Sequence, residues 1–316
     1  MKKVTLLVPC YNEEQSLPKL HAALCEVMDG LPQYLWEVLL IDDGSRDATP
    51  LVMQRLREED KRVGFISLSR NFGKENAMLA GFDHASGDCV IILDADLQHP
   101  PSLIPEMLRM WEEGVQDVYA RRDIARESWL RRRISRLYYK LLNRSTRFDV
   151  LENVGDFRLL DRRCIDALCQ LRESQRYTKG MYVWIGFRKK EILYHEQQRT
   201  AGKSSLNFRR LADLAIDGLT SYTTAPLRLS TIVGLISALM AILYMVYVFI
   251  KTLVVGEPVH GFPTIVILIL FLGGVQLISL GIIGEYLGKV FIEAKHRPVY
   301  LINRMEGVEK RAKSDL

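Results

Sequence analysis

Several patterns that would reveal a function directly are absent from this chain of 316 residues. Its five cysteines include no Cys-x-x-Cys spacing, which fits reduced core thiols and predicts no zinc site. The dinucleotide fingerprint Gly-x-Gly-x-x-Gly does not occur. Gly202-Lys203-Ser204 matches the end of a P-loop, but Gln197 stands where the first glycine of that motif belongs. The motifs therefore support neither a dinucleotide enzyme nor a P-loop ATPase.

Charged residues are also missing from two long stretches near the C-terminus. None lies between Arg228 and Lys251, and none lies between His260 and Glu285. A helix rises about 1.5 Å per residue, so each stretch is long enough to cross a hydrocarbon core of roughly 30 Å. We expect two transmembrane helices, at residues 229–250 and 262–284, joined as a hairpin. A buried helix pair of a soluble protein is the alternative.

Positive charge around this hairpin predicts its orientation. Lysine and arginine flank its two ends, at Arg209, Arg210, Arg228, Lys289, Lys295 and Arg297. The connection carries only Lys251, so the positive-inside rule places both termini in the cytoplasm. No signal peptide precedes the first predicted strand. The chain is thus expected to be a multi-pass membrane protein.

Strand and helix patterns alternate in the part of the chain before the hairpin. Short apolar runs typical of buried strands lie at residues 4–8, 38–41, 64–68, 90–93 and 115–120. Helical patterns lie between them, at residues 17–27, 51–56, 74–85 and 103–111. This alternation predicts a doubly wound, mainly parallel α/β domain. The expected order is a cytosolic domain (1–205), an amphipathic juxtamembrane segment (206–226), the hairpin region (227–289) and a cytosolic tail (290–316).

The predicted strand at residues 90–93 ends at two carboxylates. Asp94 and Asp96 stand at i and i+2, which places both side chains on one side of an extended chain. Pro100 and Pro101 prevent the strand from continuing. Repulsion between the two anions is relieved by a hard cation such as Mg²⁺ or Mn²⁺. We interpret the pair as a metal site, with an acidic helix-capping turn as the alternative.

Further polar residues follow other predicted strands. They are Tyr11, Asn12 and Glu13 after the first strand, and Asp42 and Asp43 after the second. Because the carboxyl ends of parallel strands share one edge, these side chains are expected to face the same crevice as Asp94. A solvated turn is the competing interpretation for Asp42 and Asp43. Gly155 interrupts a helical pattern, and Asp156 beside it either faces the crevice or caps the next helix.

Residues 121–147 are strongly basic, with ten lysines and arginines against Asp123 and Glu127. An apolar helical stripe runs through them, and we expect this amphipathic helix to lie on anionic lipid. A solvated helix face and nucleic-acid binding are the alternatives, and the lack of an aromatic stacking platform disfavours nucleic acid. Residues 206–219 form a second predicted interfacial helix. Before it, the loop from Arg199 to Ser204 either suits a phosphate or is a solvated connection.

Six motifs, taken in order, resemble family-2 glycosyltransferases and specifically the polyprenyl-phosphate hexose transferases. They are Pro9-Cys-Tyr-Asn-Glu, Ile41-Asp-Asp-Gly-Ser-x-Asp47, Ser69-Arg-Asn-Phe-Gly-Lys74, Asp94-Ala-Asp-Leu-Gln-x-Pro100, Gly155-Asp-Phe-Arg and Arg199-x-x-Gly-x-Ser204. With the paired spans and Gly284-Glu-Tyr-Leu-Gly, the resemblance covers nearly the whole chain and is greatest to bactoprenol glucosyltransferases of O-antigen modification. Ser205-Leu206 replaces the lysine and aromatic residue that often follow the last motif, which weakens the assignment of acceptor contacts there.

The resemblance implies a nucleotide-sugar-binding fold of the GT-A type and an inverting, metal-dependent transfer. The donor would be a nucleotide sugar, with UDP-glucose as the first choice, and the acceptor undecaprenyl phosphate at the cytoplasmic face of the bacterial inner membrane. The resemblance implies that the nucleotide sugar binds at Pro9, Tyr11, Glu13, Asp43, Lys74 and Asp94, and that the metal binds at Asp96 and Asp94. The acceptor phosphate would contact Arg122, Arg131, Ser135, Arg199 and Ser204.

Asp156 matches the position usually assigned as the catalytic base in this family. A phosphate monoester loses its second proton near pH ~6, so the acceptor arrives largely ionised and needs little help from a base. A base and a positioning role for Asp156 therefore both stay open.

Other functions remain as alternatives. The same site could take an N-acetylhexosamine, mannose or a modified arabinose. A processive polysaccharide synthase is disfavoured, because the Gln-x-x-Arg-Trp motif and the additional spans of such enzymes are missing. A flippase or structural membrane protein would not need the crevice carboxylates. The oligomeric state stays open, a homo-oligomer included.

Overall fold

The fold is described from a computed structural model of the chain, over residues 1–122, 154–174, 176–194, 225–255 and 261–309. These residues belong to two compact units, a sheet domain and a pair of long helices, and each is taken by itself. Most of the basic segment and all of residues 206–219 lie outside the described residues.

A mixed sheet of eight described strands forms the centre of the first unit, in the order β7-β5-β6-β4-β1-β2-β3-β8. The strands are β1 (Lys2–Cys10), β2 (Tyr34–Asp42), β3 (Val63–Leu68), β4 (Cys89–Ile92), β5 (Asp117–Arg122), β6 (Val154–Asp161), β7 (Lys189–Tyr194) and β8 (Ile302–Glu306). Strands β3, β2, β1 and β4 are mutually parallel, as predicted. The sheet as a whole is mixed, because β6 and β8 pair antiparallel with their neighbours.

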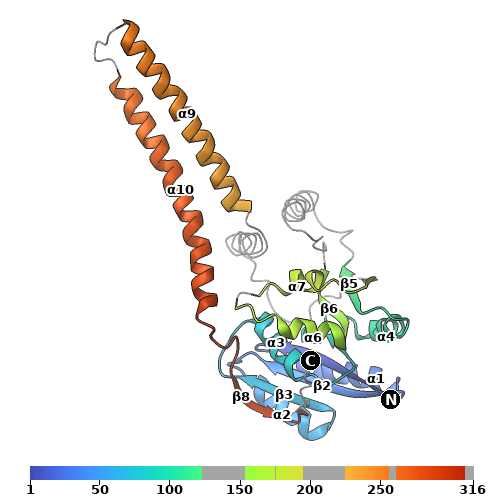
Figure 1. Ribbon diagram of the computed structural model, residues 1–316. Helices are drawn as coiled ribbons and strands as arrows, with labels where there is room; N and C mark the ends of the chain where they lie inside the picture. Colours follow the sequence, from blue (N-terminus) through green and yellow to red (C-terminus); the bar gives the residue numbers. More distant parts are fainter. Residues whose placement is uncertain (123–153, 175, 195–224, 256–260, 310–316) are drawn as a thin grey trace. The chain divides into compact units, whose positions relative to one another are not determined.

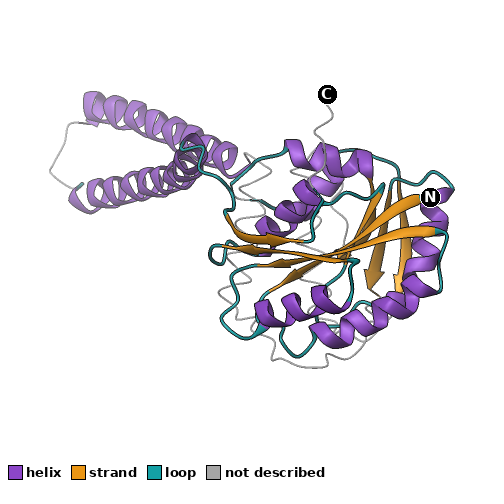
Figure 2. Ribbon diagram, turned by 90° about the horizontal axis from the view of Figure 1, so that it is seen from below, coloured by secondary structure: helices purple, strands orange, loops and turns teal. Residues whose placement is uncertain are grey.

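Helices cover both faces of this sheet (Figure 2). On one face lie α1 (Leu17–Asp29), α2 (Thr49–Glu59) and α4 (Ile104–Glu112), and on the other α3 (Lys74–His84), α6 (Arg162–Gln170) and α7 (Thr178–Trp184). In β1, Leu6 joins the first core and Leu7 the second, since successive side chains of a strand point to opposite faces. The central strands are therefore buried on both sides, which explains their continuous apolar runs.

The chain returns to the sheet after the long helices. Strand β8 pairs with β3, with Phe65 opposite Glu306. The approach requires glycine, because a Cβ on Gly64 would lie 2.6 Å from the carbonyl oxygen of Gly307. Just before β8, the hydroxyl of Tyr300 donates to Asp83 at 2.6 Å. The segment predicted to be a cytosolic tail thus contains the last strand of the sheet.

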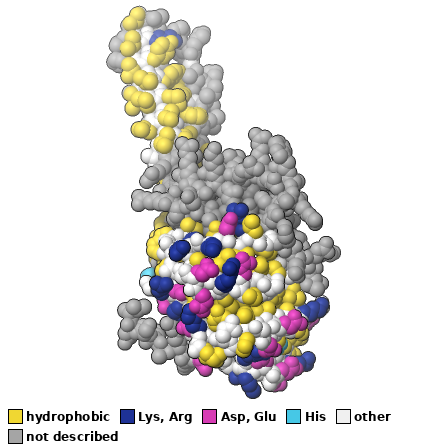
Figure 3. Space-filling view, turned by 90° about the vertical axis from the view of Figure 1, so that its right-hand side faces the viewer, with side chains coloured by type: hydrophobic (Ala, Val, Ile, Leu, Met, Phe, Trp, Pro, Cys, Tyr) yellow, Lys and Arg dark blue, Asp and Glu magenta, His cyan; other side chains and the backbone are white. Residues whose placement is uncertain are grey.

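The second unit consists of α9 (Ala225–Val255) and α10 (Phe262–Ala294), which lie side by side (Figure 1). Apolar side chains cover the visible face of these helices (Figure 3), and Leu235 and Leu277 are 71% and 73% exposed. By length and composition, one described segment, Phe271–Ala294, could cross a membrane, and α9 carries a shorter apolar stretch, Ser230–Tyr244. Both predicted spans fall within these helices, and a crossing by each of them stays a prediction.

Candidate active site

The carboxyl ends of three parallel strands meet at one edge of the sheet, because β1 lies between β2 and β4. Residues 11–13 follow β1, Asp43 follows β2, and Asp94 and Asp96 follow β4. Lys74 begins α3, the element that comes after β3. The sheet thus gathers the polar residues that the sequence predicted for one crevice.

Lys74 joins two of the predicted carboxylates. Its Nζ lies 2.5 Å from Oδ1 of Asp94 and 2.9 Å from Oδ2 of Asp156. Asp156 comes from β6, which runs antiparallel to β4 with Ile92 opposite Arg158. Continuing this register by two residues brings Asp156 level with Asp94. A strand, and not a turn, therefore positions Asp156 in the crevice.

These ion pairs set the charge states of the three groups. Burial works to lower the pKa of the Lys74 ammonium, but the charges of Asp156 and Asp94 outweigh it and raise that pKa. Burial works to raise the pKa of Asp156, and the contact with Lys74 overcomes it, so that the pKa is lowered. Asp156 is consequently an ionised carboxylate of low proton affinity.

Glu75, the next residue of α3, is an acid with the opposite behaviour. Its Oε2 accepts from the backbone N–H of Thr178 at 2.9 Å. Burial, together with the negative charge of Asp156, raises the pKa of Glu75 to about 7. Glu75 therefore exchanges its proton near neutral pH. Sequence reasoning missed it, and its only signal was its position directly after Lys74.

His99 orients the loop that carries Asp94. Its Nδ1 accepts from the backbone N–H of Asp94 at 3.2 Å, which leaves the ring proton on Nε2, 3.9 Å from Oδ2 of Asp94. The ring stacks on Phe157, with centroids 4.8 Å apart, and burial lowers the pKa of His99. The neutral imidazole therefore positions Asp94 without adding a charge. The sequence motif treated this position as variable, so His99 was also missed.

Asp43 shapes the loop that leads to Lys74. Its two carboxylate oxygens accept from the backbone N–H groups of Phe72 at 2.7 Å and Gly73 at 2.9 Å. Gly73 has φ 93°, in the left-handed region that favours glycine. Burial raises the pKa of Asp43, although the two N–H groups oppose this. Asp43 thus holds the start of α3, and its contact with a nucleotide stays a prediction.

The loop after β1 is fastened to the loop after β2. Asn12, at φ 58°, donates its N–H to Oγ of Ser45 and accepts from the N–H of Arg46, both at 2.9 Å. Glu13 donates its N–H to Oγ1 of Thr49 at 2.7 Å. These contacts fix residues 11–13 at the strand edge, and they explain why an asparagine precedes Glu13.

Three carboxylates at this edge act on one another electrostatically. Burial raises the pKa of Glu13, a hydrogen bond from Ser16 opposes this, and the charges of Asp96 and Asp94 add to it. Oδ1 of Asp96 also accepts from the backbone N–H of Gln98 at 3.1 Å. Carboxylate oxygens are the donor type that Mg²⁺ and Mn²⁺ prefer. Asp94 and Asp96 are the residues that could hold the ion.

A buried ion pair supports the strand that carries Asp156. Nη1 of Arg158 lies 3.1 Å from Oδ2 of Asp117, and both side chains are almost fully buried. The guanidinium carbon lies 3.6 Å from the ring centroid of Tyr182, and Nζ of Lys189 lies 3.7 Å from the same carboxylate oxygen. The network joins β5, β6, β7 and α7. It gives the arginine of the Gly-Asp-Phe-Arg motif a structural role.

The remaining predicted site residues are placed less centrally or lie outside the described part of the chain. Pro9 lies within β1, opposite Ile41, and Tyr11 is 42% exposed beyond the end of that strand. Arg122 is the last residue of β5. The other predicted acceptor residues, Arg131, Ser135, Arg199 and Ser204, lie outside the described residues. Their roles stay predictions.

Comparison with known proteins identifies the family of this sheet domain. Residues 5–169 match the family model described as glycosyl transferase family 2. The chain belongs to this family. In this family-2 chain, residues 225–290 match a second model, described as the GtrB C-terminal hairpin. The resemblance that the six motifs indicated is thereby confirmed.

Relatives match this glycosyltransferase over nearly their full length. It is 42% identical over 301 residues to the bactoprenol glucosyl transferase of Shigella phage SfV, covering 95% of this chain and 98% of that protein. It is 39% identical over 305 residues to a prophage bactoprenol glucosyl transferase homolog of Escherichia coli, covering 96% and 99%.

Among solved structures, glucosyl-3-phosphoglycerate synthase of Mycobacterium tuberculosis, solved with Mn²⁺ and uridine-diphosphate-glucose, is similar to this chain. The match covers 68% of this chain and 76% of that protein, at 17% identity and a TM-score of 0.46.

Proposed function

We propose that this glycosyltransferase transfers a hexose from a nucleotide sugar to undecaprenyl phosphate, with glucose from UDP-glucose as the first choice. The observation that carries the proposal is Lys74 paired with Asp94 and Asp156 at the strand edge of a family-2 domain. The match of the following helices to the GtrB hairpin supports a lipid acceptor. Relatives of the same length are named bactoprenol glucosyl transferases.

Breaking the bond between sugar and diphosphate builds negative charge on the leaving oxygen. Asp94 and Asp96 would hold Mg²⁺ or Mn²⁺, which supplies positive charge for that oxygen. Lys74 adds a second, fixed positive charge, because its carboxylate partners keep it protonated. In this proposal the nucleotide lies toward Pro9, Tyr11, Glu13 and Asp43.

Asp156 is assigned a positioning role in this transfer. The acceptor phosphate is largely a dianion above pH ~6, so its attacking oxygen needs no deprotonation in a single inverting displacement. The lowered pKa of Asp156 makes this carboxylate a weak base. Its contact with Lys74 instead holds the ammonium group between the donor-side carboxylate Asp94 and the strand β6.

The proposed location is the cytoplasmic face of the bacterial inner membrane, with both termini cytoplasmic. Strand β8 follows α10 in the chain and yet pairs with β3, so both ends of the helix pair connect to one sheet. This connectivity is consistent with an even number of membrane crossings. We propose a hairpin in which α9 and α10 each cross once, and the distribution of lysine and arginine supports the cytoplasmic side.

The experiment that tests the function incubates membranes containing the full-length protein with labelled nucleotide sugars and undecaprenyl phosphate, followed by lipid extraction. We expect labelled lipid with UDP-glucose and little with UDP-N-acetylglucosamine or GDP-mannose. Preferential labelling from another donor would keep the reaction class and change the sugar. No labelled lipid from any donor would contradict the proposal and favour a flippase or structural role.

Metal removal tests the role of Asp94 and Asp96. EDTA is expected to abolish transfer, and added Mg²⁺ or Mn²⁺ to restore it. Asp96→Asn is expected to lower kcat by ~10²-fold or more, the effect of removing one electrostatic stabiliser. Glu106→Gln, at an exposed position in the first turn of α4, serves as the matched control and is expected to keep full activity. Undiminished transfer in EDTA would rule out the metal.

A further inference from the structure

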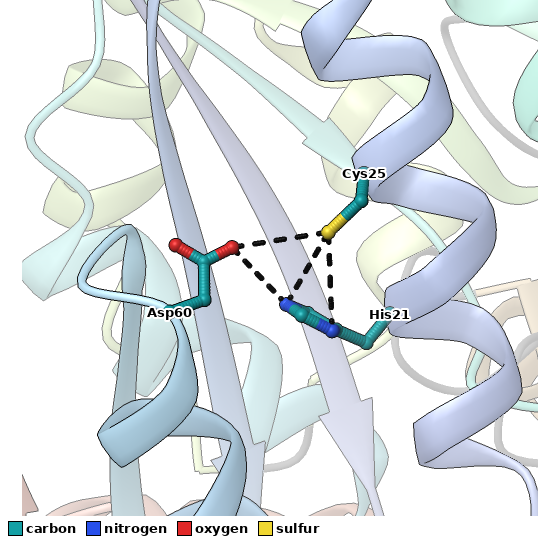
Figure 4. A group of neighbouring side chains, drawn as sticks. All are labelled: His21, Cys25 and Asp60. Carbon is teal, nitrogen blue, oxygen red and sulfur yellow. Dashed lines mark hydrogen bonds and ion pairs between the residues drawn. The ribbon is translucent and has the colours of Figure 1, made fainter.

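Three side chains with metal-binding atoms converge where α1 meets the end of α2 (Figure 4). His21 and Cys25 stand at i and i+4 of α1, one turn apart on the same helix face. Asp60 directly follows α2. All three side chains are partly buried. None of them belongs to the strand edge described above.

The distances within this group suit a tetrahedral metal ion. Nε2 of His21 lies 3.2 Å from Oδ2 of Asp60 and 3.6 Å from Sγ of Cys25. That sulfur lies 3.8 Å from the same carboxylate oxygen. Tetrahedral Zn²⁺ with bonds of about 2.0–2.3 Å separates its ligand atoms by roughly 3.3–3.8 Å. We propose that His21, Cys25 and Asp60 form a zinc site with a fourth position open to water.

The donor atoms select the class of metal. A thiolate and an imidazole favour Zn²⁺, whereas Mg²⁺ prefers oxygen ligands in an octahedron. The site therefore takes a different ion from the one proposed for Asp94 and Asp96. Cysteine spacing alone predicted no zinc site, because here the imidazole and the thiol come from one helix and the carboxylate from another element.

Arg62 provides the surrounding contacts. Its Nε lies 3.1 Å from Oδ1 and 3.0 Å from Oδ2 of Asp60, and its Nη2 lies 3.5 Å from Sγ of Cys25. Its Nη1 pairs with Asp29 at 2.8 Å. When the sulfur–zinc bond forms, the thiol proton leaves to solvent. The thiolate and the carboxylates of Asp60 and Asp29 then balance the charges of Zn²⁺ and the guanidinium, and Arg62 orients two of the ligands.

The zinc fastens α1 to the turn between α2 and β3. In the loop before α1, the N–H of Glu13 already donates to Thr49, the first residue of α2. The ion thus adds a second link, between the middle of α1 and the end of α2. Its effect is on the stability of this pair, and the site needs no part in sugar transfer.

A cobalt titration tests the site on the full-length protein in detergent, after the metal has been removed with a chelator. Co²⁺ bound by a thiolate absorbs in the near ultraviolet, and carboxylates alone give no such band. Wild-type protein is expected to bind one Co²⁺ per chain with this band, which Zn²⁺ then removes by displacement. Cys169→Ser changes the other partly buried cysteine and serves as the matched control that keeps the band.

Cys25→Ser is expected to remove the band and lower Co²⁺ affinity at least ~10-fold, since even partners outside the ligand set contribute that much. His21→Gln keeps the thiol but is expected to abolish the rise in unfolding temperature that Zn²⁺ gives wild type. Wild-type protein without a thiolate band, or an equal band in Cys25→Ser, would overturn the proposal. The trio would then be a hydrogen-bonded contact between helices. These readouts do not depend on glycosyl transfer.

Discussion

At the residue scale, the pairing of Asp156 with Lys74 predicts how the pH profile of a variant behaves. If Asp156 only positions Lys74, the amide of Asp156→Asn still accepts a hydrogen bond, and the acceptor needs no base above pH ~6. Both proteins then depend alike on the acceptor dianion, so kcat/KM for Asp156→Asn should stay measurable and rise in parallel with that for wild type between about pH 5.5 and 8. The measurement is kcat/KM against pH at saturating metal.

Donor affinity of the Asp156→Asn variant is measured separately, so that a binding defect is not read as a catalytic one. A variant that stays at background across the whole range would restore Asp156 as the obligatory base. The expected residual activity rests on the lowered pKa of this carboxylate, which suits an ion pair and not a proton acceptor.

The raised pKa of Glu75 predicts the direction in which the free energy of unfolding changes with pH. Burial and the charge of Asp156 raise its pKa from 4.5 to about 7, so between these values the folded chain holds a proton that the unfolded chain has lost. Folding then binds a proton, and the free energy of unfolding falls as pH rises through this window. Glu75→Gln removes the effect. We expect the variant to match wild type near pH ~5 and to be more stable by about 1–3 kcal/mol near pH ~8.

The measurement is the free energy of unfolding of the detergent-solubilised protein at several pH values. Glu106→Gln, an exposed acid on α4, is the control whose curve should run parallel to that of wild type. A curve for Glu75→Gln that also runs parallel would show that Glu75 is ionised throughout.

The sequence predicted the carboxylates Asp94 and Asp96 of the site, but it did not predict the neighbouring residues His99 and Glu75. Asp94 and Asp96 follow a buried apolar run directly, so strand geometry alone placed them at an edge. His99 and Glu75 act through burial and through contacts with residues distant in the chain, such as Thr178. Their surroundings exist only after folding, and no local pattern encodes them.

At the scale of the element, the buried pair of Arg158 and Asp117 predicts a large loss of stability on substitution. Among the described residues, Arg158→Leu leaves the carboxylate of Asp117 paired with the more distant Lys189. Removing one partner of a buried ion pair costs about 3–5 kcal/mol. The double variant Arg158→Leu with Asp117→Asn should lose less than the sum of the two single variants, because no uncompensated carboxylate remains.

Chemical denaturation of the four proteins in this double-mutant cycle gives the coupling. Arg109→Leu, which changes an exposed arginine of α4, is the control and should cost little. Strictly additive losses would show that β6 does not depend on the ion pair.

Strand β6 also shows where pattern reasoning failed for elements. Its polar and apolar residues alternate only over residues 156–159, because Leu160 packs in the core opposite to that of Phe157 and Leu159. From the sequence, Asp156 could either face the crevice or cap the next helix. In the structure Asp161 caps α6 by accepting from the N–H of Arg163, which excludes the cap alternative for Asp156.

At the scale of the whole molecule, β8 follows the helix pair in the chain and pairs with β3. A variant without the helix pair should therefore keep β8. A protein cut after Thr224 loses β8 together with α9 and α10. Replacing residues 225–296 by a flexible linker of about 20 residues, which reaches roughly 25 Å, keeps β8 in the chain. We expect the linker variant to be soluble, more stable than the cut protein, and slow with long-chain acceptors.

Rates with undecaprenyl phosphate in liposomes and with a short, water-soluble polyprenyl phosphate provide the test. The linker variant should approach wild type only with the short acceptor. Equal rates for the two proteins in liposomes would show that the helix pair contributes nothing to acceptor use.

The pairing of β3 with β8 also means that, during synthesis, the two long helices are made before the sheet can be completed. Phe65 pairs with Glu306, and a ribosome adding about 5–20 residues per second needs roughly 10–50 s to make the chain between them. Throughout that interval the outer edge of β3 is exposed, and both apolar helices emerge within it. Under the proposed topology, the hairpin enters the membrane before the sheet is complete. The finished enzyme therefore arises only at the membrane surface, where its lipid acceptor is found.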